Sequence, residues 1–348
     1  MLAATMASAA DNWSVSSPDG AVVFELRLDA GGALSYRVAL GAGAERTDVL
    51  AWSPLGITRA DQAFAKGLRF TGQSAKADID DSYTAVHGKK RDVRHRATEV
   101  TFSFANPSGA RLDVVVRAAT DGAAFRYRFP ESDPTARTVT AESTGFTVPA
   151  GTRAWIAPRS PAGKYTPAYE DLYIAAPAGT ASPLAAGWDF PALFSVGGRA
   201  WALVTESGLD EHFAASHLAG HAPGNTYGIR LPDAAEGQGV GKAEPSSTLP
   251  WTMPWRVVMV GRTPAAIFES TLVNDLAPPS VVADTSWIRP GRVSWSWWSD
   301  DDSPKNEAAL TSFVDFSAEM GWEYSLVDAN WNLMDPAALQ RVLTRGRE

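Results

Sequence analysis

The chain of 348 residues contains no cysteine, and it has only five histidines. Disulfides, thiolate nucleophiles and cysteine-ligated zinc are therefore excluded. None of the histidines belongs to an HExxH pair. His217 and His221 are four residues apart, but Gly220, Pro223 and Gly224 favour a solvated loop there over a metal site.

Positive charge is also scarce. Thirty-one Lys and Arg residues stand against 39 Asp and Glu residues, which gives a net charge of -8. This balance disfavours nucleic acid or an anionic membrane as a partner. No apolar run approaches the length of a membrane span, so no membrane span is expected. A composition that is 45% hydrophobic and 20% charged is typical of a globular protein. The negative net charge is more compatible with a small or neutral substrate.

The first residues, 1–12, are rich in alanine and include Ala7-Ser8-Ala9. This small-x-small pattern is typical of a signal-peptide cleavage site, although the basic n-region is missing. We interpret residues 1–12 as the remnant of a signal peptide, which predicts a periplasmic or secreted protein. The alternative is a frayed, alanine-rich start.

Residues 13–279 have a β pattern almost throughout. Apolar and polar residues alternate in 21–28, 34–40, 99–104 and 124–129, and turn signals such as Asp121-Gly122 separate these runs. The pattern predicts a large antiparallel sandwich. Residues 220–247 are expected to form a long loop. Thr263 and Pro264 are expected to open one short helix that reaches Asn274.

Residues 280–348 change character and form a linker followed by a strand–helix–strand pattern. The helix is predicted over 304–320, with Ser303 as N-cap, Pro304 at its first position and Gly321 as the left-handed residue that ends it. A second helix is predicted from Asp335-Pro336. Its inner face is expected to carry Leu339, Val342 and Leu343.

This pattern is typical of the opening of a (β/α)8 barrel. A complete barrel takes about 250 residues and eight strands, whereas only two strands and two helices fit between Arg289 and Glu348. The predicted fold class is therefore mainly β, a large antiparallel sandwich followed by the first βα units of an incomplete barrel. We expect the chain to be the amino-terminal part of a longer enzyme.

Carboxylates follow both predicted strands, where barrel enzymes place their site residues. Asp300 is a candidate for the pocket, and Asp301 and Asp302 are weaker ones, because three acidic residues before a helix also suit its positive end. Asp328 ends an otherwise apolar run, where a carboxylate is costly unless it is paired. We therefore predict a pocket role for Asp328.

Tryptophan is abundant, with 13 residues, and flat indole faces suit the C–H faces of sugar rings. Trp297 and Trp331 are the candidates for a sugar platform. Strict alternation would put Trp295 and Trp297 on one face and Trp298 on the other, so at least one of the three is expected in the core.

A third group lies in the segment 159–170, which contains Arg159, Lys164, Tyr165, Tyr169 and Glu170. These residues could form a loop that reaches the barrel mouth. The interpretation favoured by the turn-rich sequence is a structural loop with a surface ion pair.

Long motifs in the middle and in the carboxyl-terminal part of the chain resemble glycoside hydrolase family 97. They are Asp121–Tyr127, Gly187–Leu193, Trp287–Arg292, Trp295–Asp300, Asp315–Tyr324 and Val327–Trp331. The resemblance implies a β-supersandwich on a (β/α)8 barrel, a calcium ion in the active site, and exo-hydrolysis of α-linked glycosides. Members of the family include inverting α-glucosidases and retaining α-galactosidases.

The resemblance also implies that the general acid and the base or nucleophile come from barrel strands beyond Glu348, so no catalytic residue is assigned to this chain. One calcium ligand is implied at Glu206, at the end of a strand of the sandwich; a solvated strand end or a surface ion pair is the alternative. Two other functions stay open. The chain could be a non-catalytic carbohydrate-binding module, or part of another glycosidase family that joins a sandwich to a barrel.

Overall fold

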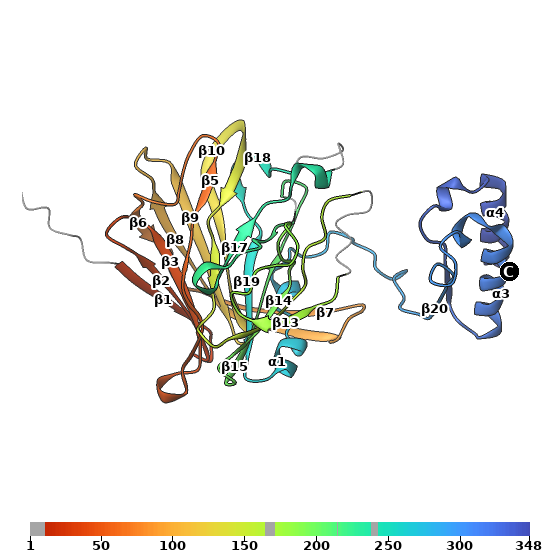
Figure 1. The fold of residues 1–348 in the computed structure, drawn as a ribbon, viewed down its shortest axis with the longest axis horizontal. Coiled ribbons are helices and arrows are strands. Elements are labelled where there is room, and N and C mark those ends of the chain that lie inside the picture. The colour runs from red at the N-terminus through yellow and green to blue at the C-terminus, as the bar shows by residue number, and fades with distance from the viewer. Residues whose placement is uncertain (1–10, 164–170, 214, 238–242) are drawn as a thin grey trace, which may run out of the picture. The chain divides into compact units, whose positions relative to one another are not determined.

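The computed structural model describes residues 11–163, 171–213, 215–237 and 243–348. It divides the chain into two compact units (Figure 1). The first unit comprises Met1–Thr84 and Asp92–Pro279, and the second comprises Ala85–Arg91 and Ser280–Glu348. Among the described residues, no helix has the length and apolar character needed to cross a bilayer.

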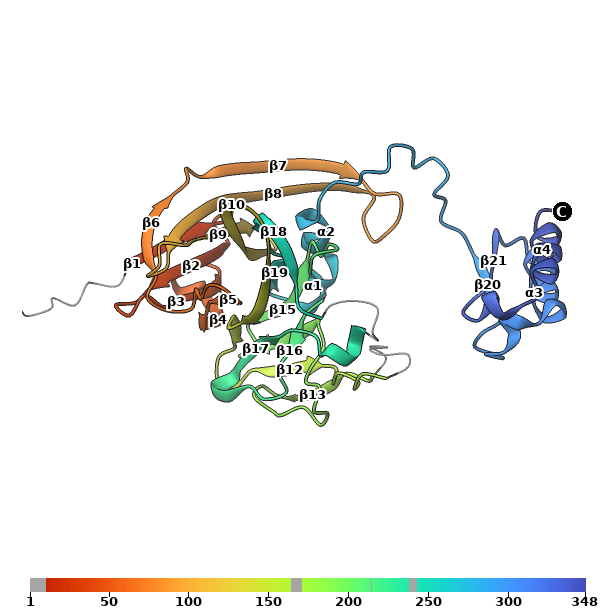
Figure 2. The same cartoon turned by 90° about the horizontal axis from the view of Figure 1, so that it is seen from above.

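The first unit is built from antiparallel sheets, which Figure 2 shows from above. A four-stranded sheet has the order β1 (Asp11–Ser16), β2 (Val22–Leu28), β3 (Leu34–Leu40), β4 (Thr47–Pro54). The main path of a 12-stranded sheet is β13 (Ile174–Pro177), β12 (Arg153–Ile156), β14 (Ala192–Val196), β15 (Ala200–Ser207), β19 (Trp255–Gly261), β10 (Gly122–Glu142), β9 (Arg111–Ala119), β8 (Asp92–Ala105), β6 (Arg69–Gln73).

Three further strands join the large sheet: β18 (Ser246–Thr252) and β5 (Ile57–Arg59) pair with β10, and β7 (Ala77–Thr84) pairs with β8. A three-stranded sheet has the order β11 (Gly145–Thr147), β17 (Thr226–Arg230), β16 (His217–Leu218). The short helices of this unit are η1 (Gly43–Glu45), η2 (Pro223–Asn225), η3 (Ala234–Gly237), α1 (Pro264–Glu269) and α2 (Leu272–Leu276).

The core of the first unit lies between sheets. Alternate residues of β2 are buried, as the sequence pattern predicts. Phe24 of β2 and Tyr36 of β3 contact Phe125 of β10, with ring centroids 5.8 and 4.7 Å apart. These contacts join the four-stranded sheet to the 12-stranded sheet face to face. The prediction of a large antiparallel sandwich is confirmed.

Two local predictions for the first unit are wrong. Residues 220–247 are not one loop, because they contain β17 and the start of β18, and His217 lies in β16. The expected helix over 264–274 is broken: α1 begins at Pro264 with Thr263 as its N-cap, but it ends at Glu269. Ser270 is extended and its hydroxyl donates to Asp121 Oδ2 at 2.6 Å, so the chain restarts as α2.

Gly32 offers a test of the packing between β2–β3 and the rest of the first unit. Its φ is 70°, and a Cβ there would lie 2.5 Å from the backbone nitrogen of Leu68. Gly20 has a similar φ of 71° but nothing within 4 Å of a Cβ. We expect Gly20→Ala to cost about 1 kcal/mol of unfolding free energy from backbone strain, and Gly32→Ala at least about 2 kcal/mol, because a clash is added.

Urea denaturation of the two glycine variants measures this difference. Equal losses would contradict the close approach of the two backbones at Gly32.

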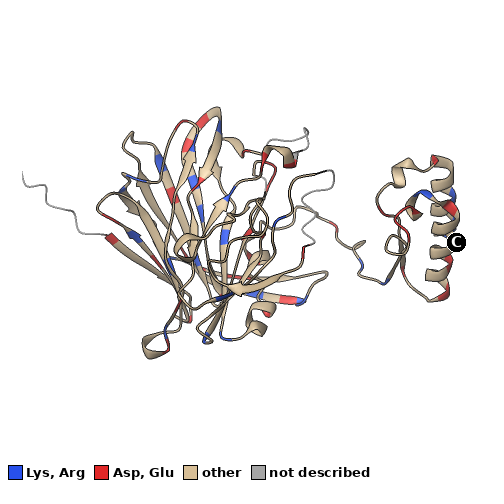
Figure 3. Cartoon of the chain, in the orientation of Figure 1, with Lys and Arg blue, Asp and Glu red and all other residues tan. Residues whose placement is uncertain are grey.

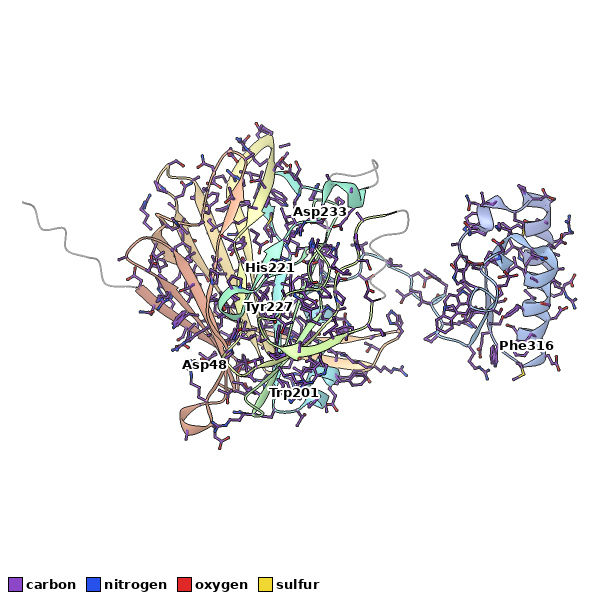
Figure 4. All side chains as sticks on the ribbon, viewed as in Figure 1. Asp48, Trp201, His221, Tyr227, Asp233 and Phe316 are labelled. Atoms are coloured by element: carbon purple, nitrogen blue, oxygen red, sulfur yellow. The ribbon has the colours of Figure 1, made fainter. Side chains whose placement is uncertain are left out.

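The second unit contains β20 (Val293–Trp295), η4 (Ser303–Lys305), α3 (Glu307–Glu319), β21 (Tyr324–Leu326), η5 (Trp331–Leu333) and α4 (Pro336–Arg345). The strands β20 and β21 are parallel, with Trp295 opposite Leu326. The helix α3 forms the crossover between them, so the predicted strand–helix–strand order is confirmed. Phe316, labelled in Figure 4, is an exposed residue of α3.

The start of α3 differs from the prediction. Asn306 is the N-cap, and its Oδ1 accepts from the nitrogen of Ala309 at 3.2 Å. Ser303 instead lies in η4, where its hydroxyl bonds to that of Ser296 at 2.7 Å. The end of α3 agrees with the prediction, since Gly321 has a φ of 64°.

The second helix, α4, begins as predicted, with the side chain of Asp335 accepting from the nitrogen of Ala337. Its buried residues are Ala338 and Val342. Leu343 is exposed, so its predicted place on the inner face is wrong.

Candidate functional site

One face of the β20–β21 pair is lined by serine hydroxyls and lies against α3. Ser294 Oγ donates to the carbonyl of Phe313 at 3.0 Å, and Ser317 Oγ donates to Ser294 Oγ at 2.6 Å. Ser325 Oγ lies 3.1 Å from Ser294 Oγ, within hydrogen-bond distance. Small side chains let the helix approach the strands closely, and the hydroxyls satisfy one another. The larger side chains of both strands must therefore lie on the other face.

That other face carries partly or fully exposed side chains: Val293, Trp295, Tyr324 and Leu326. At its carboxyl end, Trp295 Nε1 donates to Asp328 Oδ2 at 2.6 Å. The nitrogen of Ala329 donates to Asp328 Oδ1, also at 2.6 Å. The carboxylate that sequence analysis selected is thus paired with donors and held in one orientation at the end of β21.

Trp298 packs against Trp295, whose indole N–H donates to Asp328. The ring centroids of Trp295 and Trp298 are 4.9 Å apart, and Trp298 is 83% exposed. The expectation that one of the three neighbouring tryptophans belongs to the core is wrong. The strand ends at Trp295 and the chain turns, with the nitrogen of Asp300 donating to the carbonyl of Ser296, so strand alternation no longer applies.

The two tryptophans predicted as a sugar platform have different surroundings. Trp331 is 52% exposed and its nitrogen donates to the carbonyl of Asp328 at 3.4 Å, so the backbone links it to the same cluster. Trp297 is half-buried, and within the described part of the chain no ring contact joins it to Trp295 or Trp298. A backbone hydrogen bond links Asp328 to Trp331, and among the described residues no hydrogen bond or ring contact joins Asp328 to Trp297.

Asp300 lies in the turn after β20, where it is exposed. Its Oδ1 accepts from the nitrogen of Asp302, and its carbonyl accepts from the nitrogen of Ser303. Asp302 pairs with Lys305 at 2.5 Å, and this hydrogen bond raises the pKa of Lys305. In the described residues Asp300 has no hydrogen bond to Asp328 or Trp331. The acidic run thus shapes the turn that leads into α3.

Glu206, the implied calcium ligand, lies at the end of β15 inside a buried ion network. Its Oε1 accepts from the nitrogen of Ser216 at 3.0 Å, and its Oε2 accepts from Ser216 Oγ and from Arg256 at 2.7 and 2.5 Å. Arg256 also donates to both oxygens of Glu142. Burial raises the pKa of Glu206, against the opposing effect of Arg256.

These surroundings do not fit a calcium ion at Glu206. Calcium takes about six to eight oxygen ligands, and usually several carboxylates. Both oxygens of Glu206 already accept hydrogen bonds, one of them from a cation, and no cluster of three or more His, Cys, Asp or Glu residues that could hold a metal occurs in the part of the chain that the structure describes. A solvated strand end and a surface ion pair, the two alternatives, are also wrong, because the pair is buried.

A second buried ion network surrounds Arg159. The guanidinium of Arg159 donates to Asp189 Oδ1 at 2.6 Å and to Glu236 Oε2. Glu236 Oε1 accepts from the nitrogen of Asp233, a residue labelled in Figure 4. The surface ion pair expected for this segment is therefore wrong at Arg159, which is buried. Lys164, Tyr165, Tyr169 and Glu170 lie outside the described residues.

His217 is the buried histidine near this network, with 0% exposure. Neither of its ring nitrogens has a hydrogen-bond partner among the described residues. Burial, and secondarily the charge of Arg159, lower its pKa to about 4. Arg159 and His217 were considered from the sequence only as parts of loops. Asp189 and Glu236 were not identified, and the signal for Asp189 is its place between the apolar residues Trp188 and Phe190.

Charged residues of both signs are distributed along the strands, helices and loops of each unit (Figure 3). The cluster at the end of β20 and β21 combines aromatic rings with a hydrogen-bond acceptor.

Comparisons with known proteins bear on this cluster and on the fold. A family model described as "Glycosyl-hydrolase 97 N-terminal" matches residues 15–279. A "Probable retaining alpha-galactosidase" of Streptomyces bingchenggensis is 37% identical over 323 residues, which are 92% of this chain and 47% of that protein. A "Retaining alpha-galactosidase" of Bacteroides thetaiotaomicron is 32% identical over 101 residues, 27% of this chain and 15% of that protein.

Solved structures match as well. The structure described as "Crystal structure of beta-arabinopyranosidase" has a TM-score of 0.87 and 31% identity, and the match covers 96% of this chain and 54% of that one. A family 97 enzyme from Pseudoalteromonas sp. strain K8 in complex with acarbose has a TM-score of 0.77 and 21% identity, covering 96% and 53%. The chain spans about half the length of the first curated relative and of these structures.

Proposed function

This chain belongs to glycoside hydrolase family 97, and from that premise we propose that it is the amino-terminal part of an exo-acting α-glycosidase. The proposed substrate is an α-linked glycoside or oligosaccharide. The observation that carries the proposal is the pairing of Trp295 with Asp328 at the carboxyl ends of two parallel strands. In barrel enzymes, this edge of the sheet holds the active site.

We propose a galactoside, in preference to a glucoside, as the substrate. Relatives above 30% identity include proteins described as α-galactosidases and a β-arabinopyranosidase. Arabinopyranose in its L form has the ring stereochemistry of D-galactopyranose but lacks the hydroxymethyl group on C5. One pocket that recognises an axial hydroxyl at C4 therefore suits the substrates of both kinds of enzyme.

We propose that a protein with the full length of the relatives hydrolyses the glycoside with two carboxyl groups. One protonates the leaving oxygen, and the other attacks the anomeric carbon or activates water. A separation of about 5–5.5 Å gives retention and one of about 6.5–9.5 Å gives inversion. We place both groups on barrel strands in the part of the relatives that this chain does not span, and we assign neither role to a described residue. Asp328 is proposed to bind substrate hydroxyls.

Calcium assistance is a separate proposal. A calcium ion could polarise and orient the sugar, but the surroundings of Glu206 do not supply its ligands. We therefore derive no step through the ion. Export to the periplasm or the exterior is also a proposal, which rests on the residues 1–12; of these, 1–10 lie outside the described part of the chain.

A non-catalytic carbohydrate-binding module is the second candidate function, since large sandwiches present broad surfaces for sugars. Isothermal titration of the chain with galactosides and malto-oligosaccharides separates the two. Affinity in the micromolar range that persists in Asp328→Asn would favour a binding module whose site lies in the sandwich. If the chain is part of a glycosidase, we expect Kd values in the millimolar range or weaker.

The decisive test of the proposal is an assay of glycoside hydrolysis by a protein that has the full length of the family 97 relatives. We expect p-nitrophenyl α-D-galactopyranoside to be cleaved with a kcat/KM at least about fivefold higher than that of the α-glucopyranoside, because each missed polar contact costs at least about 1 kcal/mol. The same assay with a chelator tests calcium assistance. Loss of activity that calcium restores would support it, and activity indifferent to chelation would contradict it without affecting the glycosidase proposal.

A further inference from the structure

Trp298 and Asp328 both contact Trp295: the ring centroids of Trp298 and Trp295 are 4.9 Å apart, and Asp328 Oδ2 accepts from Trp295 Nε1. Trp298 is also 83% exposed. An indole and a carboxylate have the two chemical characters that a pyranose ring needs. An apolar platform and an oriented acceptor thus occur within one cluster. All of these residues belong to the second unit.

The hydrogen-bonding capacity of Asp328 is only half used. An ionised carboxylate has about four lone-pair sites. Trp295 Nε1 takes one on Oδ2 and the nitrogen of Ala329 takes one on Oδ1. One lone pair on each oxygen is left for a donor. Two neighbouring hydroxyls of a sugar are donors at a spacing that a carboxylate can accept together.

The exposed face of Trp298 adds a preference for one sugar configuration. In galactose the axial hydroxyl at C4 leaves the hydrogens of C3, C4 and C5 on one side of the ring, where they form a continuous apolar patch. In glucose the equatorial hydroxyl at C4 divides that patch. An indole face gains most from the continuous patch, because apolar contact scales with the area removed from water.

We propose that Trp298, Trp295 and Asp328 form a subsite for a galacto-configured pyranose. Trp298 is its stacking platform, Asp328 accepts two neighbouring hydroxyls, and Trp295 is a positioning residue that orients both. The inference rests on the proposed function and replaces Trp297 as the platform. It also assigns a role to Trp295, for which the sequence alone predicted none.

The probe is methyl α-D-galactopyranoside, and the measurement is saturation-transfer difference NMR on the 348-residue chain, with methyl α-D-glucopyranoside as the comparison. We expect millimolar binding of the galactoside, with the largest saturation at H3, H4 and H5, and weaker binding of the glucoside. Trp298→Ala should weaken binding about fivefold. Trp297→Ala is the matched control, three bonds of backbone away, and should leave the affinity unchanged.

The positioning role of Trp295 needs a separate comparison. Trp295→Phe keeps an aromatic ring beside Trp298 and removes the N–H donor, and Asp328→Asn removes the charged acceptor. Each should weaken binding about tenfold. The double variant should be no weaker than Asp328→Asn alone, because Trp295 acts through the carboxylate. An additive effect of the two changes would contradict the positioning role.

Two results would overturn the subsite. One is binding that Trp298→Ala leaves intact and Trp297→Ala abolishes. The other is the absence of saturation from either glycoside on a chain whose near-ultraviolet circular dichroism shows it to be folded. Neither result decides the proposed function, because the assay of hydrolysis, on a protein with the full length of the relatives, tests that function separately.

Discussion

Arg256→Ala should destabilise the first unit by about 3–5 kcal/mol, the largest effect that we expect of a single substitution in this chain. Arg256 is buried between Glu142 and Glu206 and donates to both. Its removal leaves two carboxylates buried with no cation between them, and desolvation of unpaired charges is costly. Urea denaturation followed by circular dichroism measures the loss.

The matched control is Arg94→Ala. Arg94 also pairs with a carboxylate, that of Asp80, but both side chains are exposed. We expect a change within about 0.5 kcal/mol, since surface ion pairs contribute little. A triple variant combines Arg256→Met, Glu142→Gln and Glu206→Gln. It should lose less unfolding free energy than Arg256→Ala, because the network then contains no buried charge. A cost for Arg256→Ala below about 1 kcal/mol would contradict the buried network.

The second large effect is a loss of stability in mild acid that His217 causes. Its pKa is lowered to about 4 in the folded chain, mainly by burial, whereas an unfolded histidine titrates near 6.5. Between these values the unfolded chain binds more protons, so the unfolding free energy falls as the pH falls from about 6.5 to 4. The loss attributable to His217 reaches about 3 kcal/mol below pH 4.

His217→Gln isolates this contribution, because glutamine does not titrate. Between pH 6.5 and 4.5, the slope of unfolding free energy against pH should be smaller in this variant than in the wild type. The expected difference is up to about 1.4 kcal/mol per pH unit, which corresponds to one bound proton. His87→Gln is the control, since His87 is exposed. Identical slopes in wild type and His217→Gln would show that the buried imidazole is already protonated, or that it is hydrated.

Alternation and capping were the most reliable sequence signals. The period-2 burial of β2 follows directly from its alternating residues, and Gly321 ends α3 as expected. The start of α3 was wrong by three residues, because Ser303 forms a hydrogen bond with Ser296 and leaves the capping position to Asn306. A cap can be recognised in sequence, but a competing tertiary partner cannot.

The candidate site was predicted in part. Asp328 was found because a carboxylate in an apolar run needs a partner, and the partner is Trp295. The tryptophans were harder, because strand periodicity was extended past the real end of β20. The partner of Glu206 could not be predicted. The sequence indicated that Glu206 ends a strand, but Arg256 is 50 residues away in sequence, and only the fold brings the two side chains together.

Hydrolysis of an α-galactoside by a protein that has the full length of the family 97 relatives is the most direct measurement of the proposed activity. We expect p-nitrophenyl α-D-galactopyranoside to be cleaved in preference to the α-glucopyranoside. Cleavage of neither compound by a folded protein would contradict the assignment of a glycosidase, and a clear preference for the glucoside would contradict the galacto-configured subsite.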